Sequence, residues 1–233
     1  MSDLPGRPSR RGFLKGSAAG AALAAVAVSA QAQTKEELPP LEQYKPSYFT
    51  PEEFAFIMAA CDRLIPADGD GPGALETRVP VFIDRQLEGD FGKAADWYME
   101  GPFQPDADPL LGYQSPLTPA QVYRAAIPVF EQWCQDQHGK GFADLDAQTQ
   151  DAALSALEKG NVPLKPELRD FFAFILQNTK EGYFADPMYG GNHGMKAWTY
   201  VGFPGARGAY TEWVSRFNET YPLSAVDIAG ERA

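Results

Sequence analysis

The first clear pattern of apolar and polar positions begins at Thr50. Thr50 can cap a helix, Pro51 suits the first helical position, and Glu53 completes a capping box. The apolar residues that follow fall on one helical face, and Pro66 ends the run. These residues are Phe54, Ile57, Met58, Cys61, Leu64 and Ile65. The pattern predicts an amphipathic helix between residues 51 and 65.

Three further stretches predict helices in the same way. Val79, Phe82, Ile83 and Leu87 indicate a short second helix. Residues 117–121 repeat the capping pattern, and apolar positions from Val122 to Trp133 follow, with a kink expected at Pro128. The apolar positions of residues 153–157 indicate a fourth helix that stops at Gly160.

A fifth helix is expected to open at Pro166 and to end at Gly182. Its inward positions are Leu168, Phe171, Phe172, Ile175, Leu176 and Thr179. Tyr210, Trp213, Val214 and Phe217 allow a last short helix. Alternating strand patterns are missing, so the fold class is mostly α. We expect a compact, bundle-like packing of five or six helices with long loops rich in proline and glycine.

The irregular segments set the expected organisation of the chain. Residues 33–49 are rich in proline and charge and indicate an extended N-terminal arm. Residues 100–117 form a long irregular connection, of a kind that is usually functional or faces a partner. The helical domain is expected over residues 50–220, followed by a C-terminal tail over residues 221–233.

Residues 1–32 have the features of an export signal. Arg10 and Arg11 precede Phe13 and Leu14. A mildly apolar run of about 15 residues follows, which is too short to span a membrane. Ala30 and Ala32 then give the small-x-small pattern of a cleavage site. The paired arginines indicate a twin-arginine signal peptide, a periplasmic destination and passage through the twin-arginine translocase. That route carries folded cargo, typically proteins that acquire a cofactor in the cytoplasm.

Composition narrows the classes of partner. The 233 residues suggest one domain beside the leader. Removing residues 1–32 takes away four basic and one acidic residue, which leaves 16 basic and 30 acidic residues and a net charge of −14. This charge argues against nucleic acid or an anionic membrane surface as the direct partner. Two cysteines and two histidines are too few for a typical Cys/His zinc site.

Candidate chemistry within the chain is sparse. Residues 69–74 superficially fit a dinucleotide-binding glycine loop, but a predicted helix precedes them and two aspartates would repel phosphate. Motifs for FAD, NAD or haem are not evident, so we expect this chain to bind no cofactor itself. Glu181, Asp186 and His193 lie close in sequence and would supply the acid–base groups of an enzyme, which is the less favoured alternative.

Cys61 and Cys134 lie on or near the apolar faces of their predicted helices. The exported compartment is oxidising, which favours a disulfide, but a chain exported folded first folds in a reducing cytoplasm. Three states therefore stay open: an internal disulfide, two buried thiols, or a bond to a partner chain.

Aromatic residues gather between positions 182 and 205, in a stretch with many turn residues. They are Tyr183, Phe184, Tyr189, Trp198, Tyr200 and Phe203. Aromatic side chains are favoured at protein interfaces because each buries a large area at low entropic cost. Packing of the segment on its own helices is the other interpretation, and the two have equal weight here.

The same stretch resembles the gluconate 2-dehydrogenase subunit 3 family. The resemblance is carried by residues 181–192 (EGYFADPMYGGN), by Trp198 and by residues 202–206 (GFPGA). It extends to residues 61–68 (CDRLIPAD), to residues 79–87 (VPVFIDRQL) and to the twin-arginine leader.

This resemblance implies a small, cofactor-free subunit. Its partner would be a large FAD-dependent dehydrogenase of the glucose-methanol-choline type, often joined by a membrane-bound multihaem cytochrome c. The large subunit would oxidise a sugar or sugar acid that this chain does not identify, and the small subunit would stabilise it and carry its export signal.

A stand-alone periplasmic ligand-binding or structural protein is the alternative function. If the chain is the accessory subunit that the resemblance implies, its predicted partner interface comprises ten residues. They are Tyr183, Phe184, Asp186, Met188, Tyr189, Asn192, His193, Trp198, Tyr200 and Phe203.

Overall fold

The computed structural model describes residues 38–233, so the predicted leader, with Arg10, Arg11, Phe13, Leu14, Ala30 and Ala32, lies outside the described residues. Residues 41–233 form one compact unit. Its six α-helices are α2 (Pro51–Leu64), α3 (Val79–Glu88), α4 (Pro119–His138), α5 (Ala147–Glu158), α6 (Phe171–Phe184) and α7 (Lys196–Val201). Within residues 38–233 the only β pairing consists of two isolated bridges, so the mostly α prediction is confirmed.

The two strongest helix starts form as their sequences predict. In α2 the Thr50 hydroxyl accepts from the Glu53 amide at 3.2 Å, and the Glu53 carboxylate accepts from the Thr50 amide at 2.9 Å. Thr118 and Gln121 make the same reciprocal pair at the start of α4. Each box satisfies backbone donors that would otherwise lack a partner at a helix terminus. α4 continues through Pro128.

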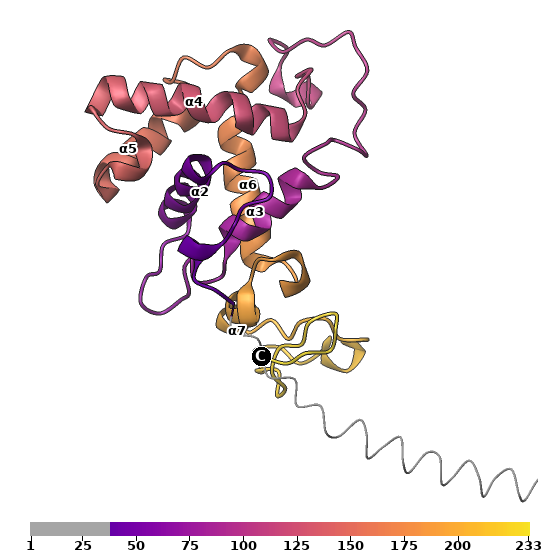
Figure 1. Ribbon diagram of the computed structural model, residues 1–233. Coiled ribbons are helices and arrows are strands. Elements are labelled where there is room, and N and C mark those ends of the chain that lie inside the picture. Colours follow the sequence, from indigo (N-terminus) through magenta and orange to yellow (C-terminus); the bar gives the residue numbers. More distant parts are fainter. Residues whose placement is uncertain (1–37) are drawn as a thin grey trace, which may run out of the picture. The chain divides into compact units, whose positions relative to one another are not determined.

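The core is an aromatic cluster built around Phe56 of α2. Its ring centroid lies 5.8 Å from that of Phe130, 5.3 Å from that of Phe142 and 6.1 Å from that of Phe171. These partners come from α4, the turn before α5 and the start of α6, and all four rings are fully buried. α6 contacts every other helix of the unit, with α4 and α5 near its start and α7 near its end (Figure 1). One buried cluster therefore joins elements far apart in the sequence.

A buried carboxylate fixes the arm that precedes α2. Asp84 lies in the middle of α3 with no exposed surface. Its two oxygens accept from the backbone amides of Ser47 (2.7 Å), Tyr48 (2.9 Å) and Phe49 (3.0 Å) and from the Tyr44 hydroxyl (2.9 Å). Four donors compensate the cost of removing the carboxylate from water. The end of the predicted arm is thus tied to α3.

Near the C-terminus the structure corrects one predicted helix and adds one that was not predicted. The expected last helix is only a 3₁₀ turn over Thr211–Trp213. Val214 and Phe217 are exposed, and Asn218 has a positive φ of 59°, so no buried face extends the turn. Conversely, α7 was not predicted, because its six residues lie in a stretch whose glycines indicate a loop.

The ends of the fifth predicted helix also differ. Pro166 opens a separate 3₁₀ turn over Pro166–Leu168, and α6 begins only at Phe171. α6 then continues two residues beyond Gly182 to Phe184.

Replacing Asp84 with alanine is expected to lower the free energy of unfolding by about 3 kcal/mol, because it leaves the buried Phe49 amide and two partly buried amides without an acceptor. Urea unfolding of the leaderless chain measures this change. Asp151→Ala is the matched control, because Asp151 pairs with Arg63 at 2.8 Å in an exposed setting and should cost under about 1 kcal/mol. Equal losses from the two variants would contradict the anchoring role of Asp84.

Candidate functional site

The candidate site is the signature segment, residues 182–205, which folds back onto the end of α6. A Cβ at Gly182 would lie 2.8 Å from the Phe82 ring, so this glycine allows α3 and α6 to cross closely. A Cβ at Gly191 would lie 2.1 Å from the Gly182 carbonyl oxygen. Gly190 has a φ of 100° and lies against the Arg85 side chain. The adjacent glycines of the segment are therefore required by close packing and by a left-handed turn.

Asn192 holds this return in place from inside. Its side chain has no exposed surface, and its φ of 42° is in the left-handed region that asparagine tolerates. The amide nitrogen donates to the Ala185 carbonyl oxygen at 3.0 Å, and the amide oxygen accepts from the Ala197 backbone amide at 3.0 Å. Asn192 therefore joins the end of α6 to the start of α7.

Two aromatic residues of the segment also pack internally. The Trp198 indole donates to the Phe184 carbonyl oxygen at 2.8 Å and so satisfies a backbone acceptor at the end of α6. Its ring meets Phe203 edge-on at 5.2 Å between centroids. The Tyr183 hydroxyl donates to the Pro72 carbonyl oxygen at 2.8 Å. Tyr183 and Trp198 are both buried, so they serve the packing of the chain itself.

Asp186 links the signature segment to the C-terminal segment, residues 206–233. One carboxylate oxygen accepts from the Met188 amide at 3.1 Å, and the other accepts from the Ile228 amide at 2.8 Å. Ala225 packs with Met195 and Trp198 in a small second core. The sequence did not indicate this contact, because no pattern relates the C-terminal segment to a loop some 40 residues earlier.

Five predicted interface residues are exposed to solvent. Their side chains are between 45% and 57% exposed, and they are Phe184, Met188, Tyr189, Tyr200 and Phe203. Tyr183, Asn192 and Trp198 are buried, while Asp186 and His193 are intermediate. The His193 backbone amide donates to the Thr77 carbonyl oxygen at 3.0 Å. The segment thus divides into internal supports and exposed apolar side chains.

The carboxylates of the predicted acid–base alternative already have structural partners. Glu181 accepts from the Gln177 side chain at 2.7 Å and from the Asn178 side chain at 3.1 Å. Asp186 accepts the two backbone amides described above. Their hydrogen bonds therefore account for both residues as structural groups.

The glycine loop at residues 69–74 does not form a nucleotide cradle. Helix α2 precedes it, and the Asp68 carboxylate accepts from the amides of Asp70 (3.2 Å) and Gly71 (2.8 Å). These amides lower the pKa of Asp68. Backbone donors that a phosphate would need are thus taken by the loop's own side chain. In residues 38–233 no cluster of His, Cys, Asp and Glu side chains could hold a metal ion.

Cys61 and Cys134 are both buried free thiols in the structure. The Cys61 sulfur lies 3.5 Å from the Thr179 hydroxyl. Burial raises the pKa of each thiol to about 12, with Glu131 adding to the effect at Cys134. At neutral pH both are therefore protonated and unreactive.

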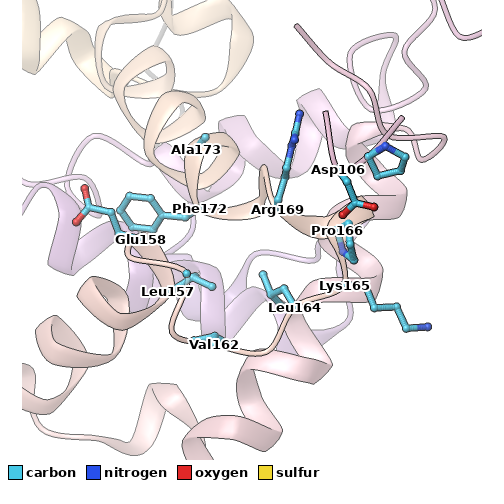
Figure 2. Close-up of a pocket in the computed structure, with 12 residues that line it drawn as sticks. Asp106, Leu157, Glu158, Val162, Leu164, Lys165, Pro166, Arg169, Phe172 and Ala173 are labelled. Carbon is cyan, nitrogen blue, oxygen red and sulfur yellow. The ribbon is translucent and has the colours of Figure 1, made fainter. Parts of the chain in front are cut away.

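The cavities of the described surface include two of similar volume. One, of about 460 Å³, lies beside the signature segment and is lined by Asp70, Lys196 and Tyr200 among others. The second, of about 490 Å³, lies between the end of α5 and the start of α6 (Figure 2). Leu157, Leu164 and Phe172 line it. Charged side chains of both signs surround these apolar residues: Asp106 and Glu158 are acidic, and Lys165 and Arg169 are basic. Neither cavity gathers the residues predicted as an acid–base set.

A comparison with protein families finds a match over residues 51–205 to the gluconate 2-dehydrogenase subunit 3 description. The chain belongs to this family. The match runs from the first residue of α2 to Gly205, and so includes the whole signature segment but leaves out the C-terminal segment. The family resemblance seen in the sequence is thereby confirmed.

Residues 7–27 match the twin-arginine translocation signal, so this member of the gluconate 2-dehydrogenase subunit 3 family carries an export signal of that pathway. No curated protein and no solved structure shows significant similarity to the chain. In residues 38–233 no helix has the length and apolar character that crossing a membrane requires.

Substitution of Gly191 by alanine is expected to destabilise the fold by about 2 kcal/mol, because its Cβ would overlap the Gly182 carbonyl oxygen. Urea unfolding midpoints of the leaderless chain measure this cost. Gly208→Ala is the control, because a Cβ there meets nothing within 4 Å, and it should change stability by less than about 0.5 kcal/mol. If Gly191→Ala kept the urea unfolding midpoint of the unmodified chain, the packing of the signature segment against the end of α6 would be loose.

Proposed function

We propose that this chain is a non-catalytic, exported accessory subunit that docks on an FAD-containing dehydrogenase through the exposed side of the signature segment. The observation that carries the proposal is the division within that segment. Buried Asn192 and Trp198 fix its backbone, while Phe184, Met188 and Tyr189 project large apolar groups into solvent. Apolar groups held in one geometry lose little conformational entropy when a partner covers them.

The family supports a partner of this kind. A chain described as subunit 3 of gluconate 2-dehydrogenase belongs to an oxidoreductase complex. We assign FAD to a large subunit of the glucose-methanol-choline type and haem c to a further cytochrome subunit in the membrane. Substrate oxidation would then take place in the large subunit, and this chain would stabilise it.

The twin-arginine signal supports a role in export. Residues 44–49 are the end of the arm that follows the leader, and Asp84 holds them on α3. These bonds form only when α3 is folded, so the arm is tied to a folded body before transport. Because the pathway accepts folded cargo, a docked large subunit without a signal of its own would cross with this chain into the periplasm.

A ligand-binding protein without a dehydrogenase partner is the second candidate function. The cavity between α5 and α6 favours it, since about 490 Å³ lies within the usual range for small-molecule sites. A leaderless chain that purifies from the native host alone, as a monomer without flavin, would support this candidate over the first.

The docking proposal predicts that the double variant Met188→Ser, Tyr189→Ser loses affinity for the large subunit. Fewer than about a third of interface residues cost more than 1 kcal/mol when truncated, and the proposal places Met188 and Tyr189 among them, so at least a tenfold loss is expected. Capture on a tagged large subunit, with the flavin absorbance of the captured complex, measures it. Val129→Ser is the control, because Val129 is also exposed but lies on α4. Undiminished capture of the double variant would contradict docking at this surface.

The export proposal predicts that the double variant Arg10→Lys, Arg11→Lys leaves the large subunit in the cytoplasm together with this chain. Fractionation followed by flavin-dependent activity in each compartment measures the distribution. A large subunit that reaches the periplasm normally beside the variant would show that it has another route.

A further inference from the structure

The cavity between α5 and α6 combines an apolar lining with charged groups of both signs (Figure 2). Leu157 at the end of α5, Phe172 at the start of α6 and Leu164 between these helices supply much of the apolar lining. Leu157 belongs to the buried core, and the other two side chains pack against that core. The apolar lining is therefore a fixed part of the fold, and the volume of about 490 Å³ suits a small molecule.

The long irregular connection before α4 supplies one side of this cavity. The Arg169 guanidinium donates to the Ala107 carbonyl oxygen, and the Ser115 hydroxyl donates to the Glu167 carbonyl oxygen at 2.8 Å. These two bonds tie the connection to the turn that precedes α6, and they bring Asp106 to the cavity. The sequence predicts a functional or partner-facing role for this connection, and docking through the signature segment gives it none.

Four charged side chains line the cavity without pairing with one another. They are Asp106, Glu158, Lys165 and Arg169. Arg169 lies 3.8 Å from the carboxylate of Asp170, which is not part of the lining. Within residues 38–233 the side chains of Asp106, Glu158 and Lys165 have no hydrogen-bond or ion-pair partner. Opposite charges are therefore held apart around one cavity, where a ligand can pair with both.

This mixed charge narrows the chemistry of a ligand. The two carboxylates of the lining would repel a simple anion, and Lys165 and Arg169 would repel a simple cation. A neutral apolar molecule would cover the charged groups without pairing them, which costs free energy. A zwitterion with an apolar side chain pairs with both signs and also covers the apolar lining.

We propose that this cavity binds a free apolar α-amino acid. Lys165 and Arg169 bind its carboxylate, Asp106 binds its ammonium group, and its side chain lies against Phe172. Arg169 can take part because only one of its five N–H groups donates to Ala107. The site is separate from the proposed docking surface, because the cavity lies at the start of α6 and the signature segment at its end, about 20 Å away by helical rise.

Calorimetric titration of the full chain with L-phenylalanine tests the site. Two matched compounds carry only one of the charges, since 3-phenylpropanoate lacks the ammonium group and 2-phenylethylamine lacks the carboxylate. L-Phenylalanine is expected to bind at least about tenfold more tightly than either, because each analogue loses hydrogen bonds between charged groups. Asp106→Asn and Lys165→Gln should each weaken its binding at least about tenfold. Both side chains are exposed, so these variants should keep the urea unfolding midpoint of the unmodified chain.

Lys140→Gln is the matched control, because Lys140 is also exposed but does not line the cavity. It should leave the affinity for L-phenylalanine unchanged. Equal weakening by Lys140→Gln would show unspecific attraction of charge and overturn the proposal. Equal affinity for either analogue, or no binding at about 1 mM L-phenylalanine, would overturn it as well. The titration contains no large subunit, so its result leaves the docking proposal undecided.

Discussion

The close crossing of α3 and α6 at Gly182 is the contact on which the candidate site depends. Because Gly182 has no side chain, its helix approaches Phe82, and because Gly191 has none, the returning segment approaches the Gly182 carbonyl oxygen. Asn192 can then reach Ala185 and Ala197 at the same time. The geometry of the exposed side chains thus follows from two glycines and one buried amide.

This arrangement explains the residue types of the signature segment. Its glycines allow close backbone packing, and Asp186 and Asn192 form hydrogen bonds with backbone groups. The buried Trp198 indole donates to the Phe184 carbonyl oxygen at the end of α6. What reaches solvent is mostly aromatic and aliphatic surface. Such a surface gains free energy when a protein face covers it. In the proposed complex, the reaction would then take place in the partner protein.

The sequence predicted the helices that carry their own signals. Thr50 and Thr118 mark starts by capping, and the apolar positions predicted for α3 and α5 are buried. In α2 the predicted face is only partly right, because it leaves out Phe56, the centre of the aromatic core. Within the site, the sequence could not separate buried Trp198 from exposed Tyr189, because burial depends on tertiary contacts. The roles of Asp84 and of Ile228 were missed for the same reason, since each partners a segment about 40 residues away.

Hydrogen exchange on this chain, alone and in complex with the large subunit, tests the central claim most directly. The account predicts that docking slows exchange in residues 184–203, because this backbone underlies the exposed apolar side chains of the signature segment. Exchange in residues 147–173, around the cavity of Figure 2, should stay unchanged. Protection confined to residues 147–173 or to the irregular connection at 100–117 would contradict it.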